Sequence, residues 1–184
     1  MSSVVPEGWF SKSLDEVSIF IRDGTHGTHE RLNEGIPLLS AKNISSDGHI
    51  NCDSGDSLIS EIDYQKIHAK YVIEKDDLLL TVVGTLGRTA LVPKGFRKFT
   101  LQRSVAIIRL DAKTIHPELC YQYLSGDEFQ RQLSLRSNST AQAGVYLGEL
   151  ARISIPVPPL PEQKKIASIL TSVDEVIENT QKQI

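Results

Sequence analysis

The chain changes character at residues 155–167, which read Ile155-Pro156-Val157-Pro158-Pro159-Leu160-Pro161-Glu162-Gln163-Lys164-Lys165-Ile166-Ala167. Four prolines in six residues cannot form the interior of a helix or of a central strand. Pro161 suits the first turn of a following helix, where its missing N–H costs nothing, and Glu162 complements the helix dipole there. The sequence therefore predicts one domain over residues 1–155 and a separate junction with a helix over residues 156–184.

The helix after the junction carries a seam with alternating steps of four and three residues. The seam is formed by Ile166, Leu170, Val173, Ile177, Thr180 and Ile184, and Ile169 and Val176 widen it. Such a heptad is typical of a coiled coil, and an apolar stripe this wide must pack on something outside its own helix. We expect a partner helix, with its own domain as the alternative. The predicted partner contacts are Ile166, Ile169, Leu170, Val173, Ile177 and Ile184.

The composition excludes several classes of protein. Hydrophobic residues make up 40% and charged residues 23%, which is ordinary for a globular domain. No apolar run is long enough to span a bilayer, and the N-terminal residues lack the pattern of a signal peptide. Cys52 and Cys120 stand far apart and outside any paired motif, so we expect free thiols and a cytoplasmic location.

Before the junction, the pattern predicts an α/β (α+β) domain with a small, twisted, mixed or antiparallel sheet and short helices. An apolar run at 78–83, a glycine turn at 84–87 and a second run at 89–92 predict a hairpin, and 105–108 predicts a third strand. Helices are expected over 61–71 and 117–135, and a strand over 152–157. The whole would end in the protruding coiled-coil-like helix.

Positive charge is concentrated in the middle of an acidic chain. The net charge is −3, but residues 78–110 contain six cations and no acidic residue, which leaves −9 for the remainder. A net negative protein is a poor general nucleic-acid binder, whereas a local basic segment is suited to specific contact with phosphates. We expect these cations to converge on one exposed surface.

Five stretches resemble the specificity subunits of Type I restriction-modification enzymes, and their order along the chain is more specific than any one of them. They are Pro6-Glu7-Gly8-Trp9; Asp23-Gly24-Thr25-His26-Gly27; Asp77-Leu78-Leu79-Leu80-Thr81 with Gly84-Thr85-Leu86-Gly87-Arg88; Gln102-Arg103-Ser104; and the junction at 155–167 with the start of its helix.

This resemblance implies a function and a set of partners. Members of the family carry two target recognition domains, each of which reads half of a split site in double-stranded DNA, and helices that set the spacing and dock methyltransferase subunits. Catalysis, S-adenosylmethionine, ATP and Mg belong to the separate modification and restriction subunits, so no catalytic residue, cofactor or metal is expected in this chain. One recognition domain and one helix start predict either a half-subunit that works as a homodimer or a fragment.

The predicted DNA contacts combine the resemblance with side-chain chemistry. Cations bind phosphates, arginine and the amides of Asn and Gln match base edges, and the backbone N–H groups of a glycine turn can bind a phosphate oxygen. The candidates are Thr25, His26, Lys42, Asn43, Thr85, Arg88, Lys94, Arg97, Lys98, Arg103, Ser139, Gln142 and Tyr146. The alternatives are a solvated loop at 94–99 whose phenylalanines enter the core, a purely structural turn at 84–88, and a simple connector at 137–146.

Two alternative functions are a small metal-dependent nuclease and a coiled-coil assembly module that does not bind DNA. His26 and His29 have no further ligands at a matching spacing for a metal. Glu162-Gln163-Lys164 and Asp111-Ala112-Lys113 match only the terminal half of a nuclease motif. A methyltransferase motif is also missing, since Leu160 rather than an aromatic residue follows Pro158-Pro159.

Overall fold

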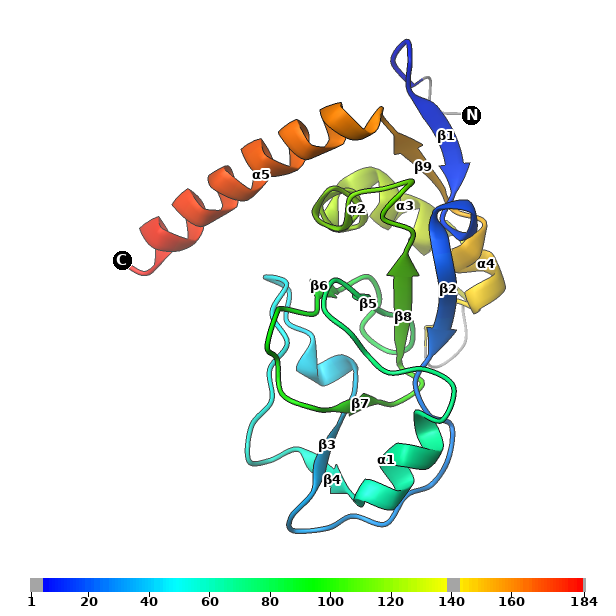
Figure 1. Ribbon diagram of the computed structural model, residues 1–184, viewed down its shortest axis with the longest axis vertical. Coiled ribbons are helices and arrows are strands. Elements are labelled where there is room, and N and C mark those ends of the chain that lie inside the picture. The colour runs from blue at the N-terminus through cyan, green and yellow to red at the C-terminus, as the bar shows by residue number, and fades with distance from the viewer. Residues whose placement is uncertain (1–4, 139–142, 184) are drawn as a thin grey trace.

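The structure is a computed structural model that describes residues 5–138 and 143–183. Its centre is a four-stranded antiparallel sheet of order β2-β8-β5-β6 (Figure 1). The strands are β2 (Ser18–Asp23), β8 (Val105–Leu110), β5 (Leu78–Thr81) and β6 (Thr89–Leu91). The predicted hairpin is therefore confirmed as β5 and β6, and the third strand lies on the other side of β5.

The central strands read as continuous apolar runs because both faces of the sheet are covered. Leu78 and Leu80 face a core that also holds Phe129 from the helical side, whereas Leu79 faces a second core with Leu101. All four residues of β5 are buried. A strand that is buried on both faces loses the polar alternation of a half-exposed strand.

Two smaller sheets complete the domain. β3 (Ile36–Leu39) pairs antiparallel with β4 (Ser57–Ile59) and parallel with β7 (Thr100–Leu101), and β1 (Phe10–Ser13) pairs antiparallel with β9 (Ser154–Val157). The prediction of small mixed and antiparallel sheets with short helices is confirmed. The sequence pattern did not show that the strands form three sheets instead of one.

Short helices cover the sheets. They are η1 (Asp15–Val17), η2 (Ala41–Asn43), α1 (Glu61–Ile67), α2 (Pro117–Ser125), α3 (Asp127–Leu135) and α4 (Leu147–Ala151). The continuous helix expected over 117–135 is wrong, because Gly126 takes an extended conformation with ψ 157° and ends α2. Glycine has a low helix propensity, and Asp127 and Glu128 then suit the first turn of a new helix.

The last helix, α5 (Leu160–Gln181), projects from the domain (Figure 1). Its first turns are attached, since Gln163 and Ala167 are buried. Further along, the apolar side chains are exposed, from 37% for Leu170 to 64% for Ile169 and Val176. Ile184 lies outside the described residues. In the described part of the chain, no helix is both long and apolar enough to cross a bilayer.

Candidate nucleic-acid interface

Three loops that connect strands meet at one end of the four-stranded sheet. The end of β2 lies beside the start of β8, and the end of β5 lies between the starts of β8 and β6. Backbone hydrogen bonds tie the three connections together: Thr25 N donates to Leu101 O (2.7 Å), Arg103 N to Thr25 O (3.2 Å) and Val82 N to Ser104 O (2.9 Å). Segments far apart in sequence thus lie together at this end of the sheet.

Two more segments are hydrogen-bonded to the loops at this end of the sheet. The segment after β3 is held by Gln102 N donating to Leu39 O (2.8 Å) and Ala41 N donating to Ser104 Oγ (3.1 Å). The segment before α4 is held by the Gly84 N donating to Ala143 O and Val145 N donating to Val82 O, both at 2.9 Å. We call the resulting region the loop surface, and it comprises residues 24–29, 40–56, 82–88, 102–104 and 143–146.

Asn43 organises the longest of these segments and is itself buried, with 3% exposure. Its Oδ1 accepts from Ser40 N (2.9 Å), and its Nδ2 donates to Asn51 O (3.0 Å) and to Asp56 Oδ1 (2.7 Å). The Asn43 amide is therefore already used inside the loop, which speaks against the predicted contact of this side chain with DNA. The Ser40-x-x-Asn43 spacing of a capping box was the signal that could have shown this.

Cations border the same segment. Lys42 is exposed and lies 3.2 Å from the buried Asp56 Oδ1, and Arg88 Nη1 donates to Ile44 O (3.1 Å). Burial acts to raise the pKa of Asp56, but hydrogen bonds from Asn43 and the Asp53 backbone, together with Lys42, hold it below its usual value. Partial burial raises the pKa of the Cys52 thiol, against the opposing charge of Arg97.

The exposed candidates on the loop surface are Lys42, His26, Arg103, Thr85 and Tyr146, and Tyr146 is 71% exposed. Within the described part of the chain, no protein acceptor is bonded to the Arg103 guanidinium. Thr25 is half-buried, with its Oγ1 2.9 Å from His29 Nε2, while the exposed His26 Nε2 lies 2.6 Å from Asp23 Oδ2. Ser139 and Gln142 lie outside the described residues.

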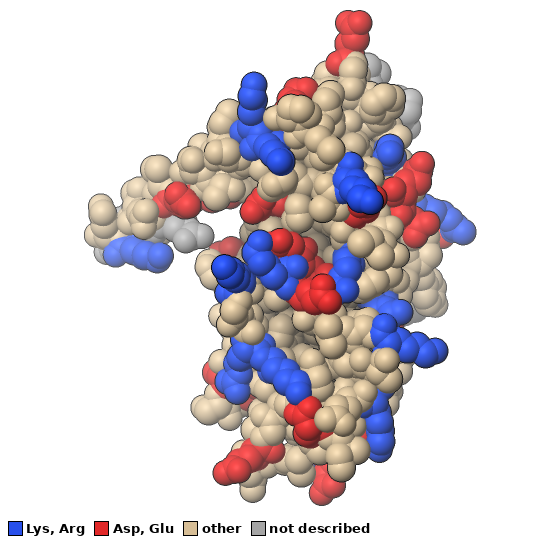
Figure 2. Space-filling model, viewed as in Figure 1, with Lys and Arg blue, Asp and Glu red and all other residues tan. Residues whose placement is uncertain are grey.

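The remaining cations of the middle segment have other neighbours. Lys98 Nζ lies 2.5 Å from Glu61 Oε1 and 4.2 Å from the centre of the Tyr64 ring. Arg109 makes two 2.8 Å hydrogen bonds to the buried Asp77. The expected convergence of all these cations on one surface is thus only partial. Figure 2 shows Lys and Arg side chains interspersed with Asp and Glu side chains on the displayed face.

The loop at 94–99 has features of both interpretations of its sequence, exposed cations and phenylalanines that enter the core. Phe99 is buried and packs edge-on against Phe96, with 5.3 Å between the ring centres, so the phenylalanines enter the second core as the structural alternative proposed. Lys94 and Arg97 are exposed beside them. The aromatic residues therefore anchor the loop, and its cations remain accessible to a ligand.

Gln130 is a supporting residue that sequence reasoning missed. Its Nε2 donates to Gly87 O (2.8 Å) and to Leu124 O (2.7 Å), so it ties the turn before β6 to the end of α2. Gly87 has a positive φ of 84° that favours glycine. No local pattern links residue 130 to this turn, since the two are 43 positions apart.

The fold and the loop surface define a small α/β module that presents loops at one end of its central sheet and carries one projecting helix. The profile of the family described as "Type I restriction modification DNA specificity domain" matches residues 6–184. The chain belongs to this family, as its resembling stretches predicted. Among the described residues, no group of three or more His, Cys, Asp or Glu side chains could hold a metal ion.

Relatives and solved structures agree with this assignment. The chain is 26% identical to the Type I restriction enzyme EcoBI specificity subunit of Escherichia coli and 27% identical to the putative MjaX specificity subunit of Methanocaldococcus jannaschii. It aligns over 98% of its own length but over only 38% and 43% of those proteins. The chain therefore spans about two fifths of the length of these relatives.

Structural similarity covers nearly the whole chain. The HsdS subunit from Thermoanaerobacter tengcongensis has a TM-score of 0.69 at 20% identity, over 99% of this chain and 41% of that one. A chain from a structural study of complex assembly in a type I R-M system has a TM-score of 0.74 at 20% identity, over 99% and 42%. These similarities establish the fold.

Proposed function

We propose that this chain reads one half of a split site in double-stranded DNA, as the recognition domain of a Type I specificity subunit. The family match over residues 6–184 supports the class of ligand, and the loop surface supports the place of contact. The reader itself would be non-catalytic. Methyltransferase and restriction subunits, with S-adenosylmethionine, ATP and Mg, would supply the chemistry.

The roles of the loop residues follow from their exposure and chemistry. Arg103 is the strongest candidate for DNA contact, because its guanidinium is exposed at the point where three connections meet. Arginine can bond a phosphate or pair bidentately with a guanine edge. Lys42, Arg88 and Arg97 would add phosphate contacts, while Thr85 and Tyr146 offer hydroxyl groups at the same surface.

Duplex binding across a range of salt concentrations tests this assignment without knowledge of the recognised sequence. Arg103→Ala should weaken binding at low salt and make log K fall less steeply with log salt, because a cation is lost from the interface. The matched control is Arg131→Ala, which removes an exposed cation paired with Glu128 on α3. If both variants bind equally, or if the wild-type chain shows no salt-dependent binding, the proposal is wrong.

We also propose that α5 associates with a second copy of the chain or with the equivalent helix of a specificity subunit. The support is its apolar stripe, which stays between 37% and 64% exposed from Ile169 to Ile177. Such pairing would place two readers on one duplex at a fixed separation, in the way that dimeric readers recognise paired half-sites.

A further inference from the structure

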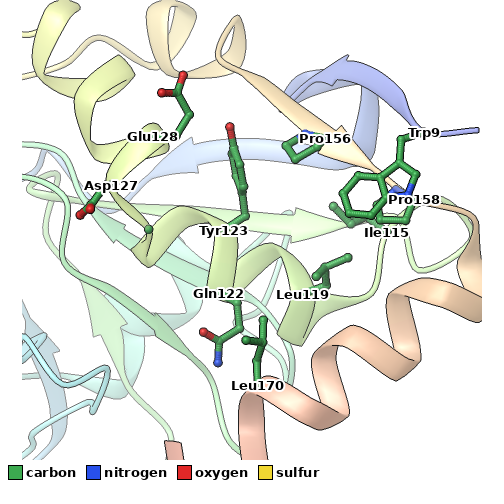
Figure 3. Close-up of a pocket in the computed structure, with 11 residues that line it drawn as sticks. Trp9, Ile115, Leu119, Gln122, Tyr123, Asp127, Glu128, Pro156, Pro158 and Leu170 are labelled. Carbon is green, nitrogen blue, oxygen red and sulfur yellow. The ribbon is translucent and has the colours of Figure 1, made fainter. Parts of the chain in front are cut away.

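Hollows lie between α5 and the domain. On one side is a hollow of about 420 Å³, whose lining includes Trp9, Leu119, Tyr123, Pro158 and Leu170 (Figure 3). On the other side is a hollow of about 330 Å³, whose lining includes His116 and Thr171. Apolar packing around the helix is therefore incomplete on both flanks, and it does not by itself fix the direction of α5.

Near the start of α5, the Gln163 side chain is fully buried at 0% exposure. Its Oε1 accepts from His116 N (2.7 Å), and its Nε2 donates to Thr114 O (3.0 Å) and Pro158 O (2.7 Å). Both amide hydrogens are used. One side chain of α5 thus joins the connection that precedes α2 to the proline junction.

The other ties between helix and domain are weaker. Trp9 Nε1 donates to Glu162 Oε1 (3.2 Å) at an exposed site, and Gln122 Nε2 donates to Asp174 Oδ2 at a partly buried one. Ala167 is buried one turn after Gln163, but its methyl group supplies no directional bond. Hydrogen bonds to solvent-accessible groups compete with water, whereas a buried amide without partners is costly. Among these ties, Gln163 is the side chain that is fully buried and bonds two separate segments of the domain.

We propose that Gln163 is a positioning residue that fixes the direction of α5 relative to the loop surface. In a pair of readers joined through α5, the same residue would fix the separation and the rotation between the two DNA half-sites. The second statement rests on the proposed DNA-reading function, whereas the first does not.

The direction of the helix can be measured without DNA. Spin labels on Arg131→Cys and Glu175→Cys, both exposed positions, report the distance between α3 and α5 in the full chain with Cys52→Ser. Dilution with unlabelled protein removes distances between copies. We expect one narrow distance for the parent chain and loss of that single peak for Gln163→Met, which keeps the length of the side chain but not its hydrogen bonds. The exposed neighbour Lys164→Ala should keep the narrow peak.

A second variant keeps the test decisive if Gln163→Met does not fold. Gln163→Glu should give a broad distribution when its carboxyl group is ionised and a narrower one at acidic pH, where the neutral acid restores one donor beside the acceptor. A general packing role would not produce this reversal. A single unchanged peak in the folded Met variant, or in the Glu variant at both pH values, would overturn the positioning role.

Methylation-site mapping with the methyltransferase subunits of the same system tests the consequence for DNA. Gln163→Met should keep the half-site sequences but lose discrimination between spacer lengths. A broadened distance with unchanged spacer selectivity would overturn the spacing role alone. If the parent chain directs no methylation and binds no DNA, the proposed function fails, while the result of the distance measurement stands.

Discussion

His68 is a buried histidine at the end of α1 that contacts β7. Its ring packs between Tyr64 and Tyr71, with centre-to-centre distances of 4.3 and 4.8 Å. Nδ1 donates to Tyr71 O (3.1 Å), so Nε2 is left to accept from the Thr100 hydroxyl (2.9 Å). In this arrangement a neutral ring with its proton on Nδ1 satisfies both contacts, and the side chain connects α1 to β7.

The unfolding free energy should therefore depend on pH through His68. Burial lowers the pKa of the folded His68 ring, with Lys98 and Arg22 acting in the same direction. The unfolded ring titrates near ~6.5, so between the two values the unfolded chain binds more protons. The unfolding free energy therefore has its full value above the pKa of the unfolded ring. It decreases as the pH falls below that value towards the lower pKa of the folded ring.

Urea denaturation between neutral and mildly acidic pH measures this loss. The His68→Gln variant, which cannot titrate, should have a lower stability at neutral pH but a flatter dependence on pH. His49→Gln is the matched control, because it removes an exposed imidazole and keeps His68, so the loss of stability assigned to His68 should persist. Equal slopes for the wild type and His68→Gln would show that the ring does not titrate as described.

At the scale of single residues, the sequence predicted types of chemistry better than it predicted partners. Arg88 and Arg103 are predicted DNA contacts and both lie on the loop surface, where Arg103 is exposed and Arg88 is half-buried and donates to Ile44 O. Asn43 and Arg109 carry equally suitable groups but are used internally, and Arg109 finds its partner Asp77 32 positions away. The spacing of neighbouring residues does not predict such pairings, because they form only when the strands assemble.

At the scale of elements, Gly24 shows how closely the connections approach one another. It follows β2 and is buried against the end of β7, where an added Cβ would lie 2.1 Å from Leu101 O. Because this neighbour is backbone, it cannot move aside as a flexible side chain could. The contact between the Thr25 segment and the Arg103 segment thus requires glycine.

The Gly24→Ala variant should lose roughly 1–3 kcal/mol of unfolding free energy, the usual range for overpacking a tight site. It should also weaken DNA binding, since it separates two connections of the loop surface. Gly148→Ala is the matched control: it lies in α4 with nothing within 4 Å of the added Cβ, and should be neutral or stabilising by up to about 1 kcal/mol. Chemical denaturation of both variants decides, and an equal stability change would contradict the close approach.

Elements with strong local signals were predicted correctly, and elements defined by pairing were not. The glycine turn and its flanking apolar runs gave the β5–β6 hairpin, and the proline cluster gave the start of α5. The parallel pairing of β3 with β7 joins residues 38 and 100, and no periodicity reports a contact over that separation. The break at Gly126 was visible as a glycine, but the apolar spacing on both sides favoured one helix.

At the scale of the whole molecule, α5 carries the largest uncovered apolar stripe. Val173 and Ile177 are about half exposed, and both belong to the predicted heptad seam. Pairing with a second copy would bury the exposed half of each, and since full burial of such a side chain contributes roughly 1.5–3 kcal/mol, the gain is about half of that for each side chain. The stripe is therefore the region where substitution should change assembly without changing the domain.

Ile177→Glu should raise the dissociation constant of a homodimer by at least about tenfold, because a burial contribution of this size is lost from each copy. Thr171→Glu adds the same charge to the opposite side of the helix and should leave association unchanged. Analytical ultracentrifugation over a concentration series distinguishes the two. A wild-type chain that remains monomeric at every concentration would contradict pairing between identical copies.

Recognition of DNA sequence by the loop surface is tested most directly by methylation-site mapping in cells that express the chain with its methyltransferase subunits. The wild-type chain should direct methylation to a defined split motif. Arg103→Ala should relax or change a few base pairs of that motif, while Arg131→Ala should leave the motif intact. A motif that is identical for all three proteins would show that the sequence is read elsewhere and would contradict the account.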